Sequence, residues 1–223
     1  MGAVKKSKAV KAEKVSKAEA TSKNKRFLHT GCGMAHKDRT TAGFNSPAWD
    51  EVRLDIDKSV SPDIVASMTD MSTVETASFD GVYSSHNIEH LYVYEVPVAL
   101  AEFKRVLKPG GFVVITCPDL QSVCALVAQG KLVEPAYMSP AGPITPLDIL
   151  YGHRASIKKG QHYMAHRCGF TKDVLMGTLR AAGFVAVAAK ARPHPHYDLW
   201  AIATTSKVEE AELRELVKEH FPN

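Results

Sequence analysis

LKPGGFVVITC, residues 107–117, joins a turn sequence to an unbroken apolar run. The Lys-Pro-Gly-Gly part stops a preceding helix, because neither proline nor glycine readily continues one. The run from Phe112 to Cys117 is of the kind that a parallel sheet buries on both of its faces. The stretch therefore predicts the end of a helix, a turn and a central strand of a parallel sheet, in that order.

Strand and helix patterns alternate on both sides of this stretch. Residues 92–107 place apolar side chains three or four positions apart, which predicts the helix before the turn. Further strands are predicted at residues 26–31, 51–56, 64–68, 79–84, 184–189 and 198–204, and further helices at 120–129, 171–182 and 208–220. This order indicates an open α/β sheet with helices on both faces, in which ligands bind beyond the carboxyl ends of the strands.

The net charge of +4 comes from one end of the chain. Residues 1–26 have a balance of +7, and the remaining residues have a balance of −3. We predict that residues 1–26 are a disordered basic tail and that residues 27–223 form the folded domain. The tail is suited either to contact with phosphate backbones or to no more than a solvated extension.

Membrane and disulfide classes are not indicated. No apolar run approaches the roughly 18 residues that a membrane span needs. The four cysteines have no paired spacing, which is typical of a reducing compartment and predicts a cytoplasmic protein.

Gly31 and Gly33 directly follow the first predicted strand, where they allow a sharp turn and the close approach of a ligand. Asp55 closes the second strand, a place from which a carboxylate can bind ribose hydroxyls. Asp70 follows the third strand and could accept a hydrogen bond from an exocyclic amine. Both aspartates could equally be ordinary turn residues.

Five stretches together resemble successive motifs of the class I S-adenosylmethionine-dependent methyltransferases, most closely the type 11 group. They are GCG at 31–33, LDID at 54–57, TDM at 69–71, FDGVYSSHNIEHL at 79–91 and LKPGG at 107–111. The resemblance implies a Rossmann-like, seven-stranded, mostly parallel sheet with helices on both faces. Its antiparallel last strand would be residues 198–204, next to the fifth strand. The implied cofactor is S-adenosyl-L-methionine.

The resemblance also implies the cofactor-binding residues, which are Gly31, Cys32, Gly33, Asp55, Ile56, Asp70, Met71, Ser85 and His86. The glycine loop would lie beneath the methionine part of the cofactor. The Asp55 carboxylate would bind the ribose, with Ile56 near the adenine. The adenine edge would meet Asp70 and the backbone around Met71. Ser85 and His86 would line the methionine side that faces the acceptor.

The chain departs from the family pattern near its first motif. His29 stands where the family usually has an acidic residue, and Ala35 replaces a third glycine. Residues 34–50 have few apolar residues at helical spacing, so we expect the first helix to be short or absent. The missing third glycine also disfavours a nicotinamide-binding Rossmann domain.

Two motifs of nucleic-acid methyltransferases are missing. Residues 85–88 do not form the Asn-Pro-Pro-aromatic motif of enzymes that methylate base amines. Cys117 stands where cytosine-C5 RNA methyltransferases keep a nucleophile, but Pro118 follows it. We interpret Cys117 as a buried structural residue, and the acceptor as a hydroxyl or amine of a small molecule.

Residues at about 130–170 are predicted to be an insertion that covers the active site. Either His162 or His166 is a candidate general base or orienting donor for the acceptor. The alternative keeps both as loop histidines that bind backbone carbonyls. No metal site is predicted, because no carboxylate or cysteine is spaced to complete one with these histidines and His153.

The predicted function is methyl transfer from S-adenosyl-L-methionine to a small-molecule hydroxyl or amine, with no membrane partner. The alternative is a weakly catalytic or non-catalytic cofactor-fold module that binds nucleic acid through residues 1–26. The mildly acidic body favours the first, because a nucleic-acid channel should be basic.

Overall fold

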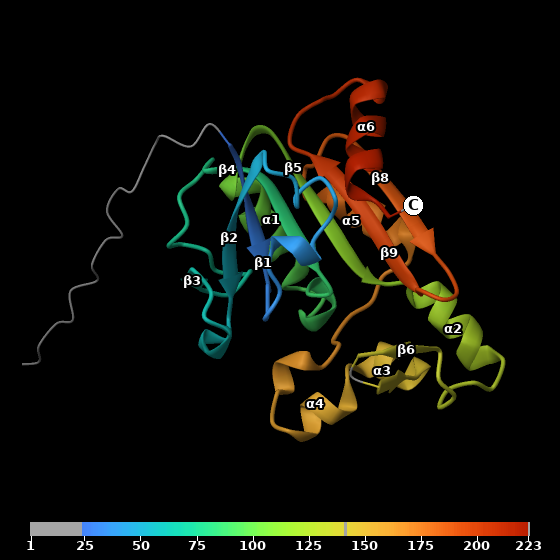
Figure 1. Cartoon of the computed structure of the whole chain (residues 1–223). Helices are drawn as coiled ribbons and strands as arrows, with labels where there is room; N and C mark the ends of the chain where they lie inside the picture. The colour runs from blue at the N-terminus through green and yellow to red at the C-terminus, as the bar shows by residue number, and fades with distance from the viewer. Residues whose placement is uncertain (1–23, 141, 223) are drawn as a thin grey trace, which may run out of the picture.

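A seven-stranded sheet forms the centre of the computed structural model, which describes residues 24–140 and 142–222 (Figure 1). Its strands lie in the spatial order β3-β2-β1-β4-β5-β9-β8. In chain order they are β1 (Lys25–Thr30), β2 (Trp49–Asp55), β3 (Ile64–Val65), β4 (Phe79–Ser85), β5 (Leu107–Pro118), β8 (Val187–Arg192) and β9 (Asp198–Thr204). Strands β1 to β5 pair in parallel, and β9 pairs antiparallel with both β5 and β8. The predicted fold class is confirmed.

The helices are α1 (Val96–Val106), α2 (Leu120–Ala128), α3 (Pro146–Tyr151), α4 (Arg154–Lys158), α5 (Lys172–Ala181) and α6 (Glu210–His220). A separate hairpin consists of β6 (Tyr137–Ser139) and β7 (Gly142–Ile144). Together with α3 and α4, this hairpin lies beyond the carboxyl ends of the parallel strands (Figure 1). None of the helices in the described ranges is long and apolar enough to cross a membrane.

The first strand begins earlier than predicted, because Lys25 and Arg26 belong to the sheet and not to the tail. The Lys25 ammonium lies 5.5 Å from the centre of the Trp49 ring, and the Arg26 guanidinium lies 5.0 Å from that of Phe79. Basic side chains pack well on aromatic faces, which explains their place in a strand. The rest of the predicted tail, residues 1–23, lies outside the described residues.

Other predicted strands also differ in their bounds, and β5 begins at Leu107, so that it includes the residues of the predicted turn. The run at 64–68 contributes only Ile64 and Val65 to β3. The strand predicted at 184–189 begins at Val187, since Phe184 turns into the core directly after Gly183, which has a φ of 84°.

The main core lies between one face of the sheet and the helices α1 and α5. Val96, Leu100 and Phe103 recur at helical spacing on α1 and are buried. Leu175 and Leu179, four positions apart on α5, are fully buried in the same cluster. The helical periodicity read from the sequence therefore corresponds to real buried faces.

The opposite face is covered without a full helix between β1 and β2. Within that connection the structure forms only the short 3-10 helix Lys37–Arg39, as the sequence led us to expect. Phe44 instead packs its ring against that of Phe27, with the ring centres 4.4 Å apart. Apolar residues of α6 pack against the same cluster. The C-terminal helix and Phe44 thus take the place of the missing helix.

Arg53 on β2 fixes the loop that replaces this helix. Its buried guanidinium donates to the backbone oxygens of Gly33, Ala35 and Ser61 at 2.6, 3.1 and 3.0 Å. A buried charge is stable only with such partners, so the side chain and the loop conformation depend on each other.

His29, in the place of the usual acidic residue, pairs with a carboxylate from the neighbouring strand. Its Nδ1 lies 2.6 Å from Oε1 of Glu51. The other oxygen of Glu51 accepts the backbone N–H of Lys37 at 2.9 Å. Both carboxylate oxygens of Glu51 on β2 are thus engaged beside His29.

His220 gives this face a pH-dependent stability. The side chain is fully buried beneath Gly43, and its Nδ1 is 2.7 Å from the Thr41 hydroxyl. Burial, and secondarily the positive charge of Lys25, lowers the pKa of His220 to about 4. An unfolded histidine has a pKa of roughly 6.5. The contribution of neutral His220 to the free energy of unfolding is therefore complete above about pH 6.5. It is lost as the pH falls toward 4, because the unfolded chain takes up the proton first.

We expect the free energy of unfolding to fall by roughly 3 kcal/mol over this window from His220 alone. Urea titrations of the wild type and of His220→Leu between pH 7 and pH 4 measure this, since the two proteins share all other titrating groups. The variant should show the flatter dependence, and equal slopes would contradict the assignment.

Candidate functional site

The loop of Gly31, Cys32 and Gly33 follows the carboxyl end of β1. Both glycines have a positive φ, 58° and 51°. A Cβ on Gly31 would lie 2.0 Å from Oδ1 of Asn87, whereas a Cβ on Gly33 would meet nothing within 4 Å. Packing therefore requires glycine at position 31, and the backbone at position 33 is open to a ligand.

Asp55 closes β2 beside this loop and is buried. One carboxylate oxygen accepts the N–H of Gly33, and the other accepts the N–H of Asp57, both at 2.8 Å. A carboxylate offers about four lone-pair positions, so about two remain for a ligand. The structure thus brings the glycine loop and Asp55 into direct contact.

Apolar side chains next to Asp55 are exposed. The exposed fractions are 61% for Ile56, 56% for Val65 and 77% for Met34. Val65 pairs with Asp55 across the sheet, and Met34 directly follows the glycine loop. Such side chains can cover the faces of a flat ring.

Asp70 and Met71 have different surroundings. The Asp70 carboxylate is exposed and accepts the N–H of Ser72, and this hydrogen bond lowers the pKa of Asp70. Met71 is fully buried, its N–H donates to Glu102 at 2.8 Å, and its carbonyl accepts from Arg105. The Met71 backbone is thus engaged inside the protein, which leaves Asp70 as the accessible member of the predicted pair.

The thiols of the site are poor nucleophiles. Burial raises the pKa of Cys32 to about 11 and the pKa of Cys117 well above its ordinary value. Burial also raises the pKa of Cys168 to about 11. All three thiols are protonated at neutral pH, which agrees with the structural interpretation of Cys117.

The end of β4 carries Ser85 and His86. The Ser85 hydroxyl shares a hydrogen bond of 2.8 Å with that of Thr116 on β5. His86 has a φ of 52°, and its Nδ1 lies 3.3 Å from a carboxylate oxygen of Glu89. Partial burial opposes the charged imidazole, whose side chain is 51% exposed, but the Glu89 carboxylate outweighs it and raises the pKa of His86.

A cavity of about 230 Å³ opens beyond the ends of β4 and β5. Its lining includes His86, Glu89, His90, His166, His196 and Tyr197. Residues of the segment at 130–170 line its other side. The same segment reaches the end of β2, where the Tyr163 hydroxyl donates to Asp57 at 3.0 Å.

The two predicted catalytic histidines differ in position. His162 is exposed, and it does not appear in the lining of this cavity. His166 lines the cavity, and its Nδ1 donates to the carbonyl of Ile149 at 2.7 Å. Because a carbonyl can only accept, Nδ1 carries the proton and the Nε2 lone pair is free. Burial lowers the pKa of His166 and so favours this neutral form.

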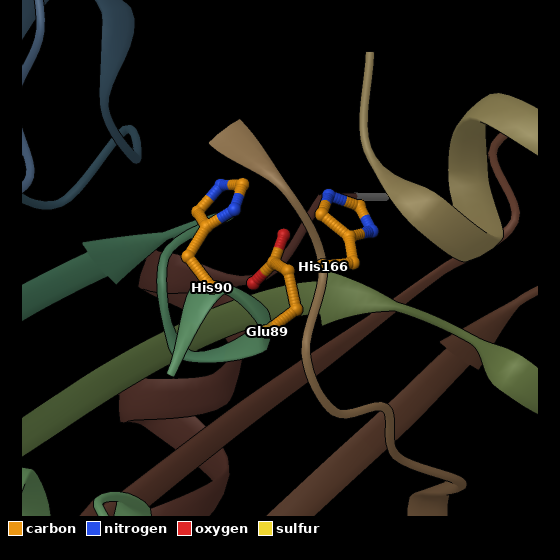
Figure 2. A group of neighbouring side chains, drawn as sticks. All are labelled: Glu89, His90 and His166. Carbon is orange, nitrogen blue, oxygen red and sulfur yellow. The ribbon is translucent and has the colours of Figure 1, made fainter. Parts of the chain in front are cut away.

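Sequence reasoning gave no role to Glu89 and His90, although both stand in the quoted motif. The structure places them beside His166, with one ligand atom of each of the three residues within 4.8 Å of the others (Figure 2). The His-x-x-Glu-His spacing of residues 86–90 was the available signal. His196, in the turn between β8 and β9, also lines the cavity.

Residues 28–115 match the family model of a methyltransferase domain, the type 11 group. Over these residues the chain is a class I methyltransferase domain of this group. S-adenosyl-L-methionine is the cofactor of this family, as the sequence predicted. None of the curated proteins compared with this chain matches it in sequence.

Solved structures of methyltransferases have the same fold. One is the 1,6-didemethyltoxoflavin-N1-methyltransferase of Burkholderia thailandensis with bound 1,6-didemethyltoxoflavin and S-adenosylhomocysteine, at a TM-score of 0.53 and 17% identity over 82% of this chain and 72% of that one. Another is a methyltransferase of Methanosarcina mazei, with a TM-score of 0.53 and 16% identity over 82% of this chain and 93% of that one. A third is a possible histamine N-methyltransferase of Thermotoga maritima, with a TM-score of 0.50 and 15% identity over 82% of this chain and 83% of that one. At these identities the likeness establishes the fold.

Proposed function

We propose that the protein transfers the methyl group of S-adenosyl-L-methionine to a hydroxyl or amine of a small molecule. The observation that carries the proposal is the cavity of about 230 Å³, lined by histidines, at the carboxyl edge of a methyltransferase sheet. An enclosure of this size suits a small acceptor and not a polymer.

The residues at the ends of β1 and β2 fit the cofactor. Asp55 retains lone pairs for ribose hydroxyls, and Gly33 leaves its backbone open. Ile56 offers an exposed apolar surface for the adenine, with Asp70 accessible at its edge. The backbone of Cys32 completes the glycine loop, and Ser85 and His86 stand on the side toward the acceptor.

When bound, the cofactor supplies an electrophilic methyl group: the acceptor's lone pair bonds to the methyl carbon while the carbon–sulfur bond breaks and leaves its electron pair on sulfur. The protein's part is to hold the acceptor in line and to help its proton leave. His166 is suited to this part because its free Nε2 lone pair belongs to a neutral imidazole in the cavity wall.

Asp55→Ala should weaken the binding of S-adenosylhomocysteine, the cofactor product, by roughly 1 to 3 kcal/mol. This is the range for the loss of charge-assisted hydrogen bonds in a partly buried site. Calorimetry measures it, and Asp57→Ala serves as the comparison because Asp57 lies two residues further along. If Asp57→Ala weakens binding while Asp55→Ala does not, the ribose contact belongs to Asp57.

The nucleic-acid alternative has no support in the described residues. Residues 1–23, which carry most of the predicted basic tail, lie outside them. The cavity wall contains the carboxylates of Glu89 and Asp148, which suit a phosphate backbone poorly.

A further inference from the structure

Glu89 is a buried carboxylate that no hydrogen bond satisfies, and its charged neighbour is His86. It is 1% exposed, and neither of its carboxylate oxygens has a hydrogen-bond partner within residues 24–140 and 142–222. His86 approaches it to 3.3 Å without forming a hydrogen bond. Burying a carboxylate costs several kcal/mol unless it is paired, hydrogen-bonded or coordinated to a metal. Because the neighbouring His86 side chain is about half exposed and makes no hydrogen bond to it, the Glu89 carboxylate can still bind a further cation.

Two imidazoles flank this carboxylate, one from each of two chain segments. Ligand atoms of Glu89, His90 and His166 all lie within 4.8 Å of one another, and the two rings have centres 4.9 Å apart (Figure 2). The backbone joins the segments directly, because the carbonyl of Glu89 accepts the N–H of Arg167 at 2.8 Å. The three side chains are thus held together by the main chain.

Both imidazoles are oriented as metal ligands usually are. His90 donates its Nδ1–H to the carbonyl of Ala165 at 3.2 Å, and His166 donates its Nδ1–H to that of Ile149 at 2.7 Å. In the neutral form of each ring, the lone pair is then on Nε2. A backbone carbonyl on the other ring nitrogen is a common second partner of metal-bound histidine, because it fixes the tautomer and raises the basicity of the ligand.

The geometry points to a binding site for one divalent transition-metal ion, of which Zn²⁺ is the representative, formed by Glu89, His90 and His166. Two histidines and one carboxylate are a ligand set of catalytic zinc sites, which keep a fourth position open. Ligands of a tetrahedral ion with bonds near 2.1 Å lie roughly 3.4 Å apart. Binding thus requires the three side chains to draw together by about an ångström.

The open position would face the cavity, because all three ligands line it. An ion there can bind the oxygen or nitrogen of an acceptor and lower its pKa. In the metal-bound protein Nε2 of His166 is occupied by the ion, so the acceptor's proton then passes to water, and the base role proposed for His166 applies to the metal-free protein. This role rests on the proposed function, whereas the binding of the ion does not.

The test is a calorimetric titration of Zn²⁺ into the untagged full chain after removal of metal by a chelator. We expect one Zn²⁺ per chain in the wild type, and a loss of affinity of more than about 100-fold in both His166→Ala and His90→Ala. The basis is that removing even a hydrogen-bond partner of a ligand costs roughly 10- to 100-fold. His162→Ala, an exposed histidine of the same segment, should bind as the wild type does.

Binding of S-adenosylhomocysteine and the thermal midpoint are recorded for every variant. The thermal midpoint distinguishes a variant that has lost only the metal site from one that does not fold. Binding of S-adenosylhomocysteine reports on the cofactor site independently of the ion. His90 is only half-buried, so His90→Ala keeps the test usable if His166→Ala does not fold. The inference is overturned if the wild type binds no Zn²⁺, or if folded His90→Ala binds it as tightly as the wild type.

Discussion

His166→Ala should lose roughly 100-fold or more in turnover, the usual scale for removing a group that handles the acceptor's proton. The imidazole lines the cavity with a free Nε2, and alanine leaves neither a base nor a ligand there. The affinity for S-adenosylhomocysteine should barely change, because His166 contacts Ile149, Tyr151 and His90 and not the glycine loop or Asp55. Single-turnover kinetics with labelled cofactor, and calorimetry for binding, measure the two effects.

The matched control is His162→Ala, which removes an exposed histidine from the same segment and should retain near-normal turnover. The pH profile adds a second readout. Because burial lowers the pKa of His166, the wild-type rate should hold below pH 6.5 and fall only at more acidic pH. If His162→Ala loses turnover while His166→Ala does not, the assignment is wrong.

Phe44→Ala should lower the free energy of unfolding by about 3 to 5 kcal/mol, the range for emptying a buried phenylalanine site. The Phe44 ring is fully buried, with centre-to-centre distances of 4.4 Å to Phe27, 4.9 Å to Trp49 and 4.4 Å to His220. Since the connection from β1 to β2 has no full helix, few other side chains can fill the space. Urea denaturation followed by circular dichroism measures the loss.

Val185→Ala is the control for this change, because Val185 is 53% exposed. Its effect should stay within about 0.5 kcal/mol, as for most surface substitutions. A loss below about 1 kcal/mol in Phe44→Ala would show that α6 covers this face of the sheet without help from Phe44.

Most of the sheet could be predicted from the sequence because its signals are local. The run from Phe112 to Cys117 and the period-two pattern before Asp55 depend only on neighbouring residues. The substitute for the first helix could not be predicted in this way. It joins Thr41 and Phe44 to His220, some 180 positions along the chain, and no local pattern encodes such a contact.

The candidate site also has a part that local sequence patterns predict and a part that they do not. The glycine loop and Asp55 lie at the ends of regular strands, so their proximity follows from the topology of a parallel sheet. The place of His166 depends on an irregular segment that docks on Glu89 through the N–H of Arg167. Because that segment has no periodicity, the sequence left His162 and His166 as equal candidates and did not group Glu89 with either.

The most direct test of methyl transfer to a small molecule uses cofactor labelled in the methyl group. The full chain is incubated with the small-molecule and macromolecular fractions of a cell extract, and labelled products are identified by mass. We expect label in a small hydroxyl or amine compound and S-adenosylhomocysteine in equal amount, with both formed roughly 100-fold more slowly by His166→Ala. Label in nucleic acid or protein, or no S-adenosylhomocysteine with any fraction, would contradict the account.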